Sequence, residues 1–412
     1  MKLRGALLPA AALAVVAVAL AACGGSSSSQ APVPGSTPAA GSQSQPAVAV
    51  DFHPVAGNFK PDKTTLESCG DKRSNTCYEQ AFGNITFYQG PKAAFKIYDQ
   101  DIANPGPIEA DCHRIAHTIG SAALARDKGN VAKAFSEGES SCWSGYYHGI
   151  LERALINVDS RSVQAVGKIA SNLCSDPSIR RVAWILYQCV HGLGHGLMIF
   201  SGYDLPFALR VCDQLATSWD QTSCKGGVFM ENISSSYGFK SKWLKDSDPV
   251  YPCNWVKEND KLYCYLMVTS RVLRLNNFDW EKTAKICAVV ETNWVATCFQ
   301  SYGRDASGST RQNPEEILKL CAVAKPFGGQ VDCIDAAAKD MTANYSSGLQ
   351  ASVLCRETSA ELRGGCFYSI GSIMGSFKTT SPERQADCHA ITKEAAYYAQ
   401  CIRAADPYAS AS

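Results

Sequence analysis

The stretch Cys287-Ala-Val-Val-Glu-Thr-Asn-Trp-Val-Ala-Thr-Cys298, "CAVVETNWVATC", places two cysteines 11 residues apart. Similar pairs return along the C-terminal half of the chain at a constant interval. Their first cysteines follow one another in steps of 34, 34, 34 and 33 residues, at Cys253, Cys287, Cys321, Cys355 and Cys388. A period of this length is typical of helical hairpins that stack into a solenoid. We therefore predict an all-α fold of disulfide-stapled helical hairpins that form an α-solenoid.

Helix-start signals fit this period. Asn313-Pro-Glu-Glu supplies an N-cap residue, a proline at the first helical position and acids in the first turn. Ser381-Pro-Glu-Arg has the same form. Each signal precedes the first cysteine of its pair by seven or eight residues. The first cysteine is therefore expected about two turns into the first helix of a hairpin, helix A. The second cysteine is expected to open helix B.

The cysteine count indicates a disulfide framework. Of 19 cysteines, Cys23 lies near the N-terminus and the other 18 form an even set. We infer pairing by adjacency, one choice among the many that the count permits. A short closed loop of this kind stabilises by roughly 2–3 kcal/mol in the chain-entropy model. The expected bonds are Cys69–Cys77, Cys112–Cys142, Cys174–Cys189, Cys212–Cys224, Cys253–Cys264, Cys287–Cys298, Cys321–Cys333, Cys355–Cys366 and Cys388–Cys401.

The first 23 residues have the order of an export signal. A basic segment, Met1-Lys-Leu-Arg, precedes an apolar run over residues 5–20, and Leu20-Ala-Ala-Cys23 closes it. This order resembles the signal peptide and lipobox of bacterial lipoproteins, in which the cysteine is lipidated and becomes the mature N-terminus. The resemblance implies an exported protein, anchored by lipid to a bilayer of the bacterial cell envelope. The anchor would lie at the outer face of the cytoplasmic membrane or in the periplasm at the outer membrane.

Composition divides the chain into four segments. We expect a signal peptide over residues 1–22 and, over residues 23–50, the lipidated Cys23 with an uncharged Gly/Ser/Pro-rich tether. Irregular helical repeats are expected over residues 51–240, and regular repeats of about 34 residues over residues 241–412. The 39 Lys and Arg residues, less Lys2 and Arg4 of the signal, leave 37 against 38 Asp and Glu. Without a basic run, nucleic acid is not an expected partner.

Five of the seven histidines fall between positions 113 and 195, within the irregular repeats: His113, His117, His148, His191 and His195. His113/His117, His148/Glu152 and His191/His195 are each four residues apart, a spacing that places both members on one face of a helix. His148 and His195 each follow the expected B-helix cysteine by six residues. These two pairs should therefore occupy equivalent faces of neighbouring hairpins. We expect the His113/His117 pair on a long A helix.

Glycines accompany the histidines in the same register. Gly145, Gly192 and Gly227 lie three residues after their cysteines, and Gly149 and Gly196 lie seven after. A glycine inside a helix costs about 1 kcal/mol relative to alanine. We therefore expect close approach of the helices, which would bring the imidazoles of separate helices together. Glu231 replaces the glycine at the seventh position of the third helix and is expected to point into the same space.

This pattern predicts a site for one or two transition-metal ions. Imidazole is a common ligand for such ions, and pairs from different helices can complete a coordination shell. Zinc is the first expectation, with copper or iron as alternatives. Haem is disfavoured, and no Cys-x-x-Cys-His motif for covalent haem occurs. The candidate ligands are His113, His117, His148, His191, His195 and Glu231.

Whether the protein is an enzyme stays open at this point. Gly192 stands where a His-Glu-x-x-His metalloprotease needs its glutamate, and no Gly-x-Ser-x-Gly motif occurs. If a metal-bound water were the nucleophile, Glu152 or Glu231 would be the candidate base. The chain resembles tetratricopeptide-like repeats in period only and resembles no characterised enzyme family.

Two functions follow from the pattern. The first is a cell-envelope lipoprotein that binds transition metal for acquisition, storage or catalysis. The alternative is a surface scaffold for a protein or cell-wall partner, with histidines that only pack and hydrogen-bond. In the C-terminal half the equivalent helix positions are polar, which predicts either a concave binding surface or a solvated face. These positions are Ser270/Arg271, Arg304/Asp305 and Lys339/Asp340.

Overall fold

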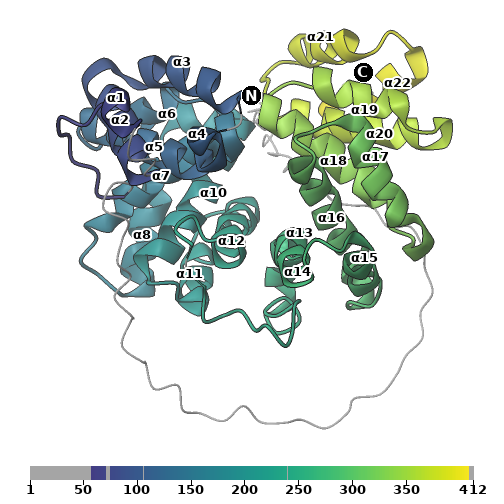
Figure 1. The fold of residues 1–412 in the computed structure, drawn as a ribbon, viewed down its shortest axis with the longest axis horizontal. Coiled ribbons are helices and arrows are strands. Elements are labelled where there is room, and N and C mark those ends of the chain that lie inside the picture. The colour runs from purple at the N-terminus through teal and green to yellow at the C-terminus, as the bar shows by residue number, and fades with distance from the viewer. Residues whose placement is uncertain (1–56, 71–74, 105, 239, 408–412) are drawn as a thin grey trace, which may run out of the picture. The chain divides into compact units, whose positions relative to one another are not determined.

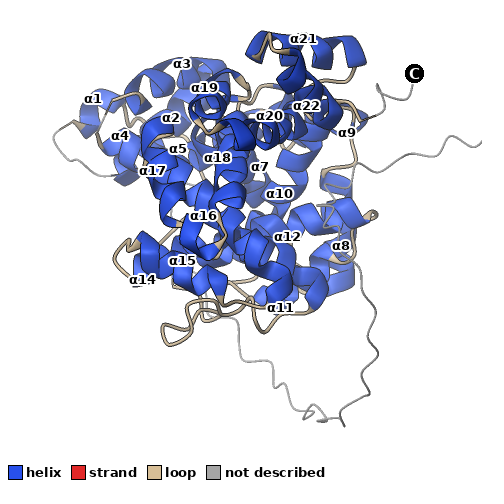
Figure 2. Ribbon diagram, turned by 90° about the vertical axis from the view of Figure 1, so that its right-hand side faces the viewer, coloured by secondary structure: helices blue, strands red, loops and turns tan. Residues whose placement is uncertain are grey.

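The computed structural model describes residues 57–70, 75–104, 106–238 and 240–407, which belong to one compact unit, residues 47–412. Within these ranges the regular structure is helical throughout, apart from one isolated bridge between Lys245 and Asp248 (Figure 2). The predicted all-α class is therefore confirmed. The expected signal peptide, Cys23 and the tether lie outside the described residues.

The first twelve helices hold the histidine-bearing segment. They are α1 Leu66–Cys69, α2 Asn75–Gln89, α3 Pro91–Ile102, α4 Pro107–Ala110, α5 Cys112–Arg126, α6 Val131–Ser136, α7 Ser141–Ile156, α8 Val163–Leu173, α9 Pro177–Arg180, α10 Ala183–Phe200, α11 Leu205–Cys212 and α12 Ser218–Ile233.

The helices after the segment 234–257 belong to the regular repeats. They are α13 Lys261–Met267, α14 Thr269–Leu275, α15 Trp280–Ala288, α16 Val295–Ser309, α17 Pro314–Val323, α18 Gln330–Tyr345, α19 Leu349–Glu357, α20 Ala360–Met374, α21 Ser381–Ile391 and α22 Ala395–Ala405, with short 3₁₀ turns η1 Glu258–Asp260, η2 Thr292–Trp294 and η3 Lys325–Phe327.

One row of helices runs through the whole described part. Helices α5, α7, α10, α12, α13, α16, α18, α20 and α22 each pack against the next in this order (Figure 1). The helices between them in the sequence, such as α11, α15, α17 and α19, cover this inner row from outside. Successive hairpins that contact their neighbours in order define a solenoid, as the cysteine period predicts.

Helices of the inner row that are far apart in the sequence also contact each other. Helix α7 packs against α18. The backbone N–H of Trp184 donates to the carbonyl of Ser376 at 3.0 Å, and the Trp184 ring packs edge-on against Phe377. These contacts tie the histidine-bearing helices to the regular repeats.

Nine disulfides connect the described cysteines. Each joins the two cysteines that adjacency in the sequence pairs, with Cα atoms 5.3–6.0 Å apart. The second cysteine does not generally open helix B, however. Cys189 lies in the second turn of α10, and Cys224 lies in the second turn of α12. The helices begin before the second cysteine because capping residues start them. In α12, for example, the Thr217 side chain accepts a hydrogen bond from the Asp220 N–H.

The expectation of an A helix for His113 and His117 was wrong. Their helix, α5, belongs to the inner row and packs along α7, so Cys112–Cys142 joins the starts of two inner helices. The 30-residue separation of these cysteines accommodates a complete inner helix and the short outer helix α6. The cysteine spacing alone does not distinguish this arrangement from an enlarged hairpin.

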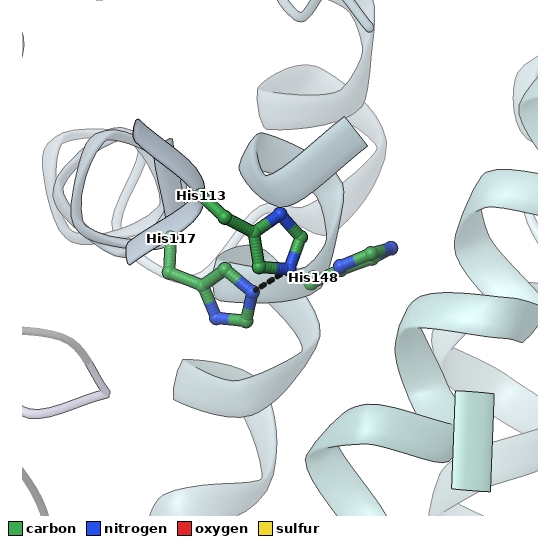
Figure 3. A group of neighbouring side chains, drawn as sticks. All are labelled: His113, His117 and His148. Atoms are coloured by element: carbon green, nitrogen blue, oxygen red, sulfur yellow. Dashed lines mark hydrogen bonds between the residues drawn. The ribbon is translucent and has the colours of Figure 1, made fainter. Parts of the chain in front are cut away.

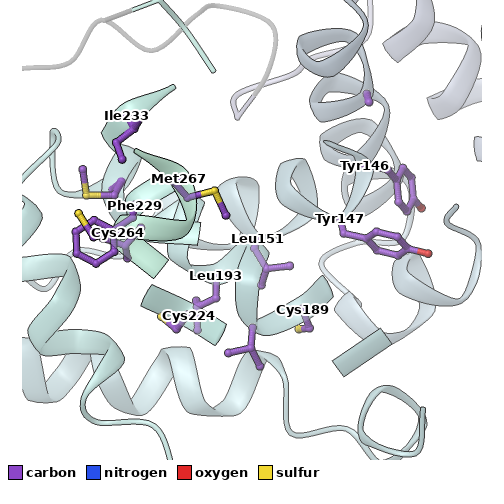
Figure 4. Close-up of a cluster of buried hydrophobic side chains, with 14 of the residues drawn as sticks. Tyr146, Tyr147, Leu151, Cys189, Leu193, Cys224, Phe229, Ile233, Cys264 and Met267 are labelled. Atoms are coloured by element: carbon purple, nitrogen blue, oxygen red, sulfur yellow. The ribbon is translucent and has the colours of Figure 1, made fainter. Parts of the chain in front are cut away.

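Glycines allow the inner helices to approach closely, as predicted. A Cβ atom at Gly149 would lie 1.9 Å from the carbonyl oxygen of His117, and one at Gly227 would lie 1.9 Å from that of His191. Around these backbone contacts, side chains such as Leu151 and Leu193 fill the core (Figure 4). The close approach sets the distance between the imidazoles of successive helices.

A second glycine position repeats along the solenoid. Gly194, Gly303 and Gly371 each lie five residues after a B-helix cysteine. A Cβ atom at each would lie 2.0–2.2 Å from the carbonyl oxygen of the B-helix cysteine in the next repeat. The same backbone contact therefore spaces both the irregular and the regular repeats.

Candidate metal centre

Three successive inner helices bring five histidines into one buried cluster. His113 and His117 come from α5, His148 from α7, and His191 and His195 from α10. The centroid of the His148 ring lies 5.3, 5.4, 5.5 and 4.1 Å from those of His113, His117, His191 and His195. We call these five side chains the histidine cluster.

The cluster contains two groups that could each hold a metal ion. His113, His117 and His148 form the first group (Figure 3), and His148, His191 and His195 form the second. Within each group the ligand nitrogens lie within 4.8 Å of one another. Tetrahedral coordination with metal–nitrogen bonds of about 2.0–2.1 Å needs nitrogens about 3.4 Å apart, so the side chains of either group must move closer to bind an ion, and a fourth ligand must complete the shell.

The His113 ring is oriented by the backbone of α7. Its Nδ1 lies 3.0 Å from the carbonyl oxygen of Cys142, which accepts the Nδ1 proton. Nε2 is then the unprotonated nitrogen and carries the lone pair of the ring. It faces Nε2 of His117 at 3.2 Å (Figure 3).

Glu152 contacts the Nδ1 atom of His117. Its Oε2 lies 3.2 Å from His117 Nδ1, and the Tyr237 hydroxyl donates to the same oxygen at 2.5 Å. The carboxyl group and the His117 ring are both buried. A carboxyl group at Nδ1 fixes the orientation of the ring, which is a recurrent arrangement around histidines that bind ions.

Glu231 has the same relation to His195. Its carboxylate lies 2.8 Å from His195 Nδ1 and accepts hydrogen bonds from the Tyr203 hydroxyl at 2.6 Å and from both the N–H and the hydroxyl of Ser236. These four contacts occupy the carboxylate oxygens. Glu231 therefore points towards the cluster, as its sequence position predicts, but contacts the far side of a histidine.

Several ring nitrogens in the cluster lack hydrogen-bond partners. They are Nδ1 and Nε2 of His148, Nδ1 of His191 and Nε2 of His195. The three residues are only 1, 4 and 1% exposed. Burying a polar atom without a partner costs about 1–3 kcal/mol, so a metal ion or an ordered water bound at these nitrogens would stabilise the fold.

Burial keeps the histidines uncharged. It lowers the pKa of His113 and of His117 from 6.5 to about 4, and it holds the pKa values of His148, His191 and His195 well below the ordinary range. Burial also raises the pKa of Glu152 to about 8, against the Tyr237 hydrogen bond, which lowers it. Neutral imidazoles are the form that binds metal ions at neutral pH.

Sequence inspection missed the groups that hold the two glutamates. Tyr203 follows the end of α10, while Ser236 and Tyr237 lie in the loop after α12. No periodicity marks loop residues of this kind. Tyr146 and Tyr147, which stand beside His148 in the sequence, pack instead into the core near Phe95 and Phe135.

Four of the six polar positions of the C-terminal half line one pocket, whereas Arg271 and Lys339 do not line it. Ser270, Arg304, Asp305 and Asp340 line a pocket of about 440 Å³ together with Trp143. The ring centroid of Trp143 lies 6.4 Å from that of His113, so the pocket lies beside the histidine cluster.

Comparison with protein-family models, with curated proteins and with solved structures finds no match for this chain. No helix in the described residues combines the length and the hydropathy that membrane crossing requires. The nine disulfides indicate an oxidising, extracytoplasmic compartment.

Proposed function

We propose that this chain is a lipid-anchored protein of the bacterial cell envelope that binds transition-metal ions in its histidine cluster. The observation that carries the proposal is the set of buried ring nitrogens without partners on His148 and His195, in a cluster where the ligand nitrogens of each group lie within 4.8 Å of one another. A packing role for the histidines would leave these nitrogens unsatisfied, whereas metal ions would satisfy them.

Zinc is the proposed resident ion. Each group in the cluster offers three imidazoles, and three protein ligands with one open position are typical of zinc sites that bind water or a substrate. The site contains no thiolate, because the described cysteines are in disulfides. Copper(II) shares the preference for imidazole and is the second candidate.

The carboxylates act as supports of the ligands in this proposal. Glu152 and Glu231 hold the Nδ1 atoms of His117 and His195, so the proposed direct ligands are the five histidines alone. The same contacts argue against either carboxylate as a free general base, since both are already engaged with the rings and with tyrosine hydroxyls.

The test is thermal unfolding of the full-length, oxidised and chelator-stripped protein with and without zinc. A ligand that binds only the folded state raises the midpoint temperature. We expect a rise in the wild type and in His389→Ala, an exposed histidine of α21, and a smaller rise in His191→Ala/His195→Ala, which keeps only the group of His113, His117 and His148. An equal rise in the double variant, or none in the wild type, would favour the scaffold function with structural histidines.

A further inference from the structure

We propose that His148 ligates two metal ions at once, one through each ring nitrogen, so that the histidine cluster is a dinuclear centre. The inference rests on the proposed metal binding and adds the number of ions and the residue that joins them. His148 is the member that the two metal-binding groups share. It comes from α7, which packs between α5 and α10 in the inner row.

The hydrogen bonds of the cluster single out His148. Nδ1 of His113, His117 and His195 contacts, in turn, the Cys142 carbonyl, Glu152 and Glu231. In each of these rings Nδ1 is therefore engaged with the protein. Nε2 of His113 and Nε2 of His117 also contact each other at 3.2 Å, so an ion bound between them would replace that contact.

Neither nitrogen of His148 has a hydrogen-bond partner, although the residue is only 1% exposed. A neutral imidazole carries one N–H donor and one acceptor nitrogen, so in a metal-free site this ring buries both a donor and an acceptor without a partner. Two ions, one on each side, satisfy both nitrogens. One ion leaves the other nitrogen unsatisfied.

The orientation of the ring fits this role. One nitrogen of His148 faces the His113/His117 pair, and the other points away from that pair (Figure 3). On the α10 side the His148 ring stacks on His195, with ring centroids 4.1 Å apart, and lies 5.5 Å from His191. Two further imidazoles therefore lie on each side of the ring. Because an imidazole binds an ion in the plane of its ring, His195 must turn out of its stacked orientation before it can share an ion with His148.

The chemistry of the bridge also reduces the charge of the site. The first ion takes the lone pair of the neutral His148 ring. The second ion displaces the remaining N–H proton, which passes to the buffer, and the ring becomes an imidazolate anion that binds both ions. This negative charge offsets part of the positive charge that two divalent ions bring into a buried site.

The experiment uses copper(II) as a paramagnetic probe in the full-length, oxidised and metal-stripped protein. Copper content and the doubly integrated electron paramagnetic resonance signal are measured at two added equivalents. An imidazolate bridge couples the two electron spins antiferromagnetically. We therefore expect two bound ions per chain and a signal several-fold smaller than the bound copper would give if uncoupled.

Two variants complete the test. His148→Gln cannot bridge, so each copper ion that it binds should give its full signal, whereas the control His389→Gln should behave as the wild type. One bound ion per chain, two ions with full signal in the wild type, or coupling that persists in His148→Gln would overturn the bridge. Absence of bound copper from the wild type would overturn the metal-binding proposal as well.

Discussion

At the residue scale, the histidine cluster is organised by what holds each Nδ1 atom. A backbone carbonyl orients His113, whereas carboxyl groups orient His117 and His195. Tyrosine hydroxyls in turn fix these carboxyl groups. This second layer of hydrogen bonds preorganises the ring nitrogens, which would lower the free-energy cost of the proposed metal binding.

Replacing Glu231 should therefore weaken metal binding without removing a ligand. In Glu231→Gln the amide no longer offers His195 a charged acceptor, and we expect zinc affinity to fall about 10–100-fold. Competition with a chromophoric chelator measures the affinity. The control is Glu357→Gln, at the exposed end of α19, which should leave the affinity unchanged. Equal affinity in Glu231→Gln and wild type would exclude this supporting role.

The metal-free protein should lose stability when acidified. The folded-state pKa of His113 and of His117 is about 4 against an ordinary 6.5, so the unfolded state binds protons first as the pH falls. The free energy of unfolding should then decrease from about pH 6.5 to about pH 4, by several kcal/mol in total.

Glu152 has the opposite effect on stability. Its folded-state pKa of about 8 lies above its ordinary 4.5, so its contribution is complete below pH 4.5 and is lost as the pH rises through 8. Denaturant unfolding in a chelator, with the disulfides intact, should thus give a maximum near pH 6.5. A stability that increases between pH 6.5 and pH 4 would contradict the assignment of neutral, buried histidines.

The sequence predicted the members of the cluster but could not assign their roles. Spacing of four residues and a common offset from the cysteines identified the five histidines and placed Glu231 near them. A carboxylate can bind the ion directly or can bind the Nδ1 atom of a histidine. Which of the two it does depends on the distance that its side chain spans and on the neighbouring hydroxyl groups. Tyr203 and Ser236 supply those contacts from outside the helices, where no pattern in the sequence marks them.

At the element scale, glycine sets the separation of the inner helices. Gly149 illustrates this because a methyl group there would overlap the His117 carbonyl oxygen at 1.9 Å, and both backbones belong to rigid helices. We expect Gly149→Ala to destabilise the oxidised protein by at least about 3 kcal/mol, from overpacking that the neighbouring backbone cannot relieve.

A glycine of α20 provides a matched control for this prediction. At Gly364 the nearest atom to an added Cβ is Gln400 Cγ at 3.7 Å, so Gly364→Ala should be neutral or stabilise by up to about 1 kcal/mol through helix propensity. Guanidinium unfolding measures both variants. Equal effects of the two substitutions would show that helix spacing does not depend on Gly149.

The cysteine period predicted the hairpins and their stacking, but it did not predict every helix correctly. Cys112 and Cys142 have the sequence form of an enlarged A/B pair, yet both start inner helices. The misassignment arises because a disulfide requires only that two Cα atoms lie about 5–6 Å apart, and this condition holds between stacked inner helices as well as within a hairpin.

At the scale of the whole molecule, the described unit combines the histidine cluster with an adjoining pocket, and nine disulfides connect its helices. The proposed anchor lies in the segment before this unit. We expect Cys23→Ser to release the protein from the membrane fraction, since a lipid cannot attach to serine, while the fold and the metal content remain. Detergent phase partitioning of cell extracts measures the change. Retention of Cys23→Ser in the detergent phase would contradict lipid anchoring at this cysteine.

The central claim is that five histidines from three neighbouring helices hold two metal ions. Elemental mass spectrometry of the full-length, oxidised protein after zinc reconstitution tests it most directly, beside His191→Ala/His195→Ala. We predict two equivalents of zinc in the wild type and one in the variant, which retains the group of His113, His117 and His148. No stoichiometric metal in the wild type, or two equivalents in the variant, would contradict the claim.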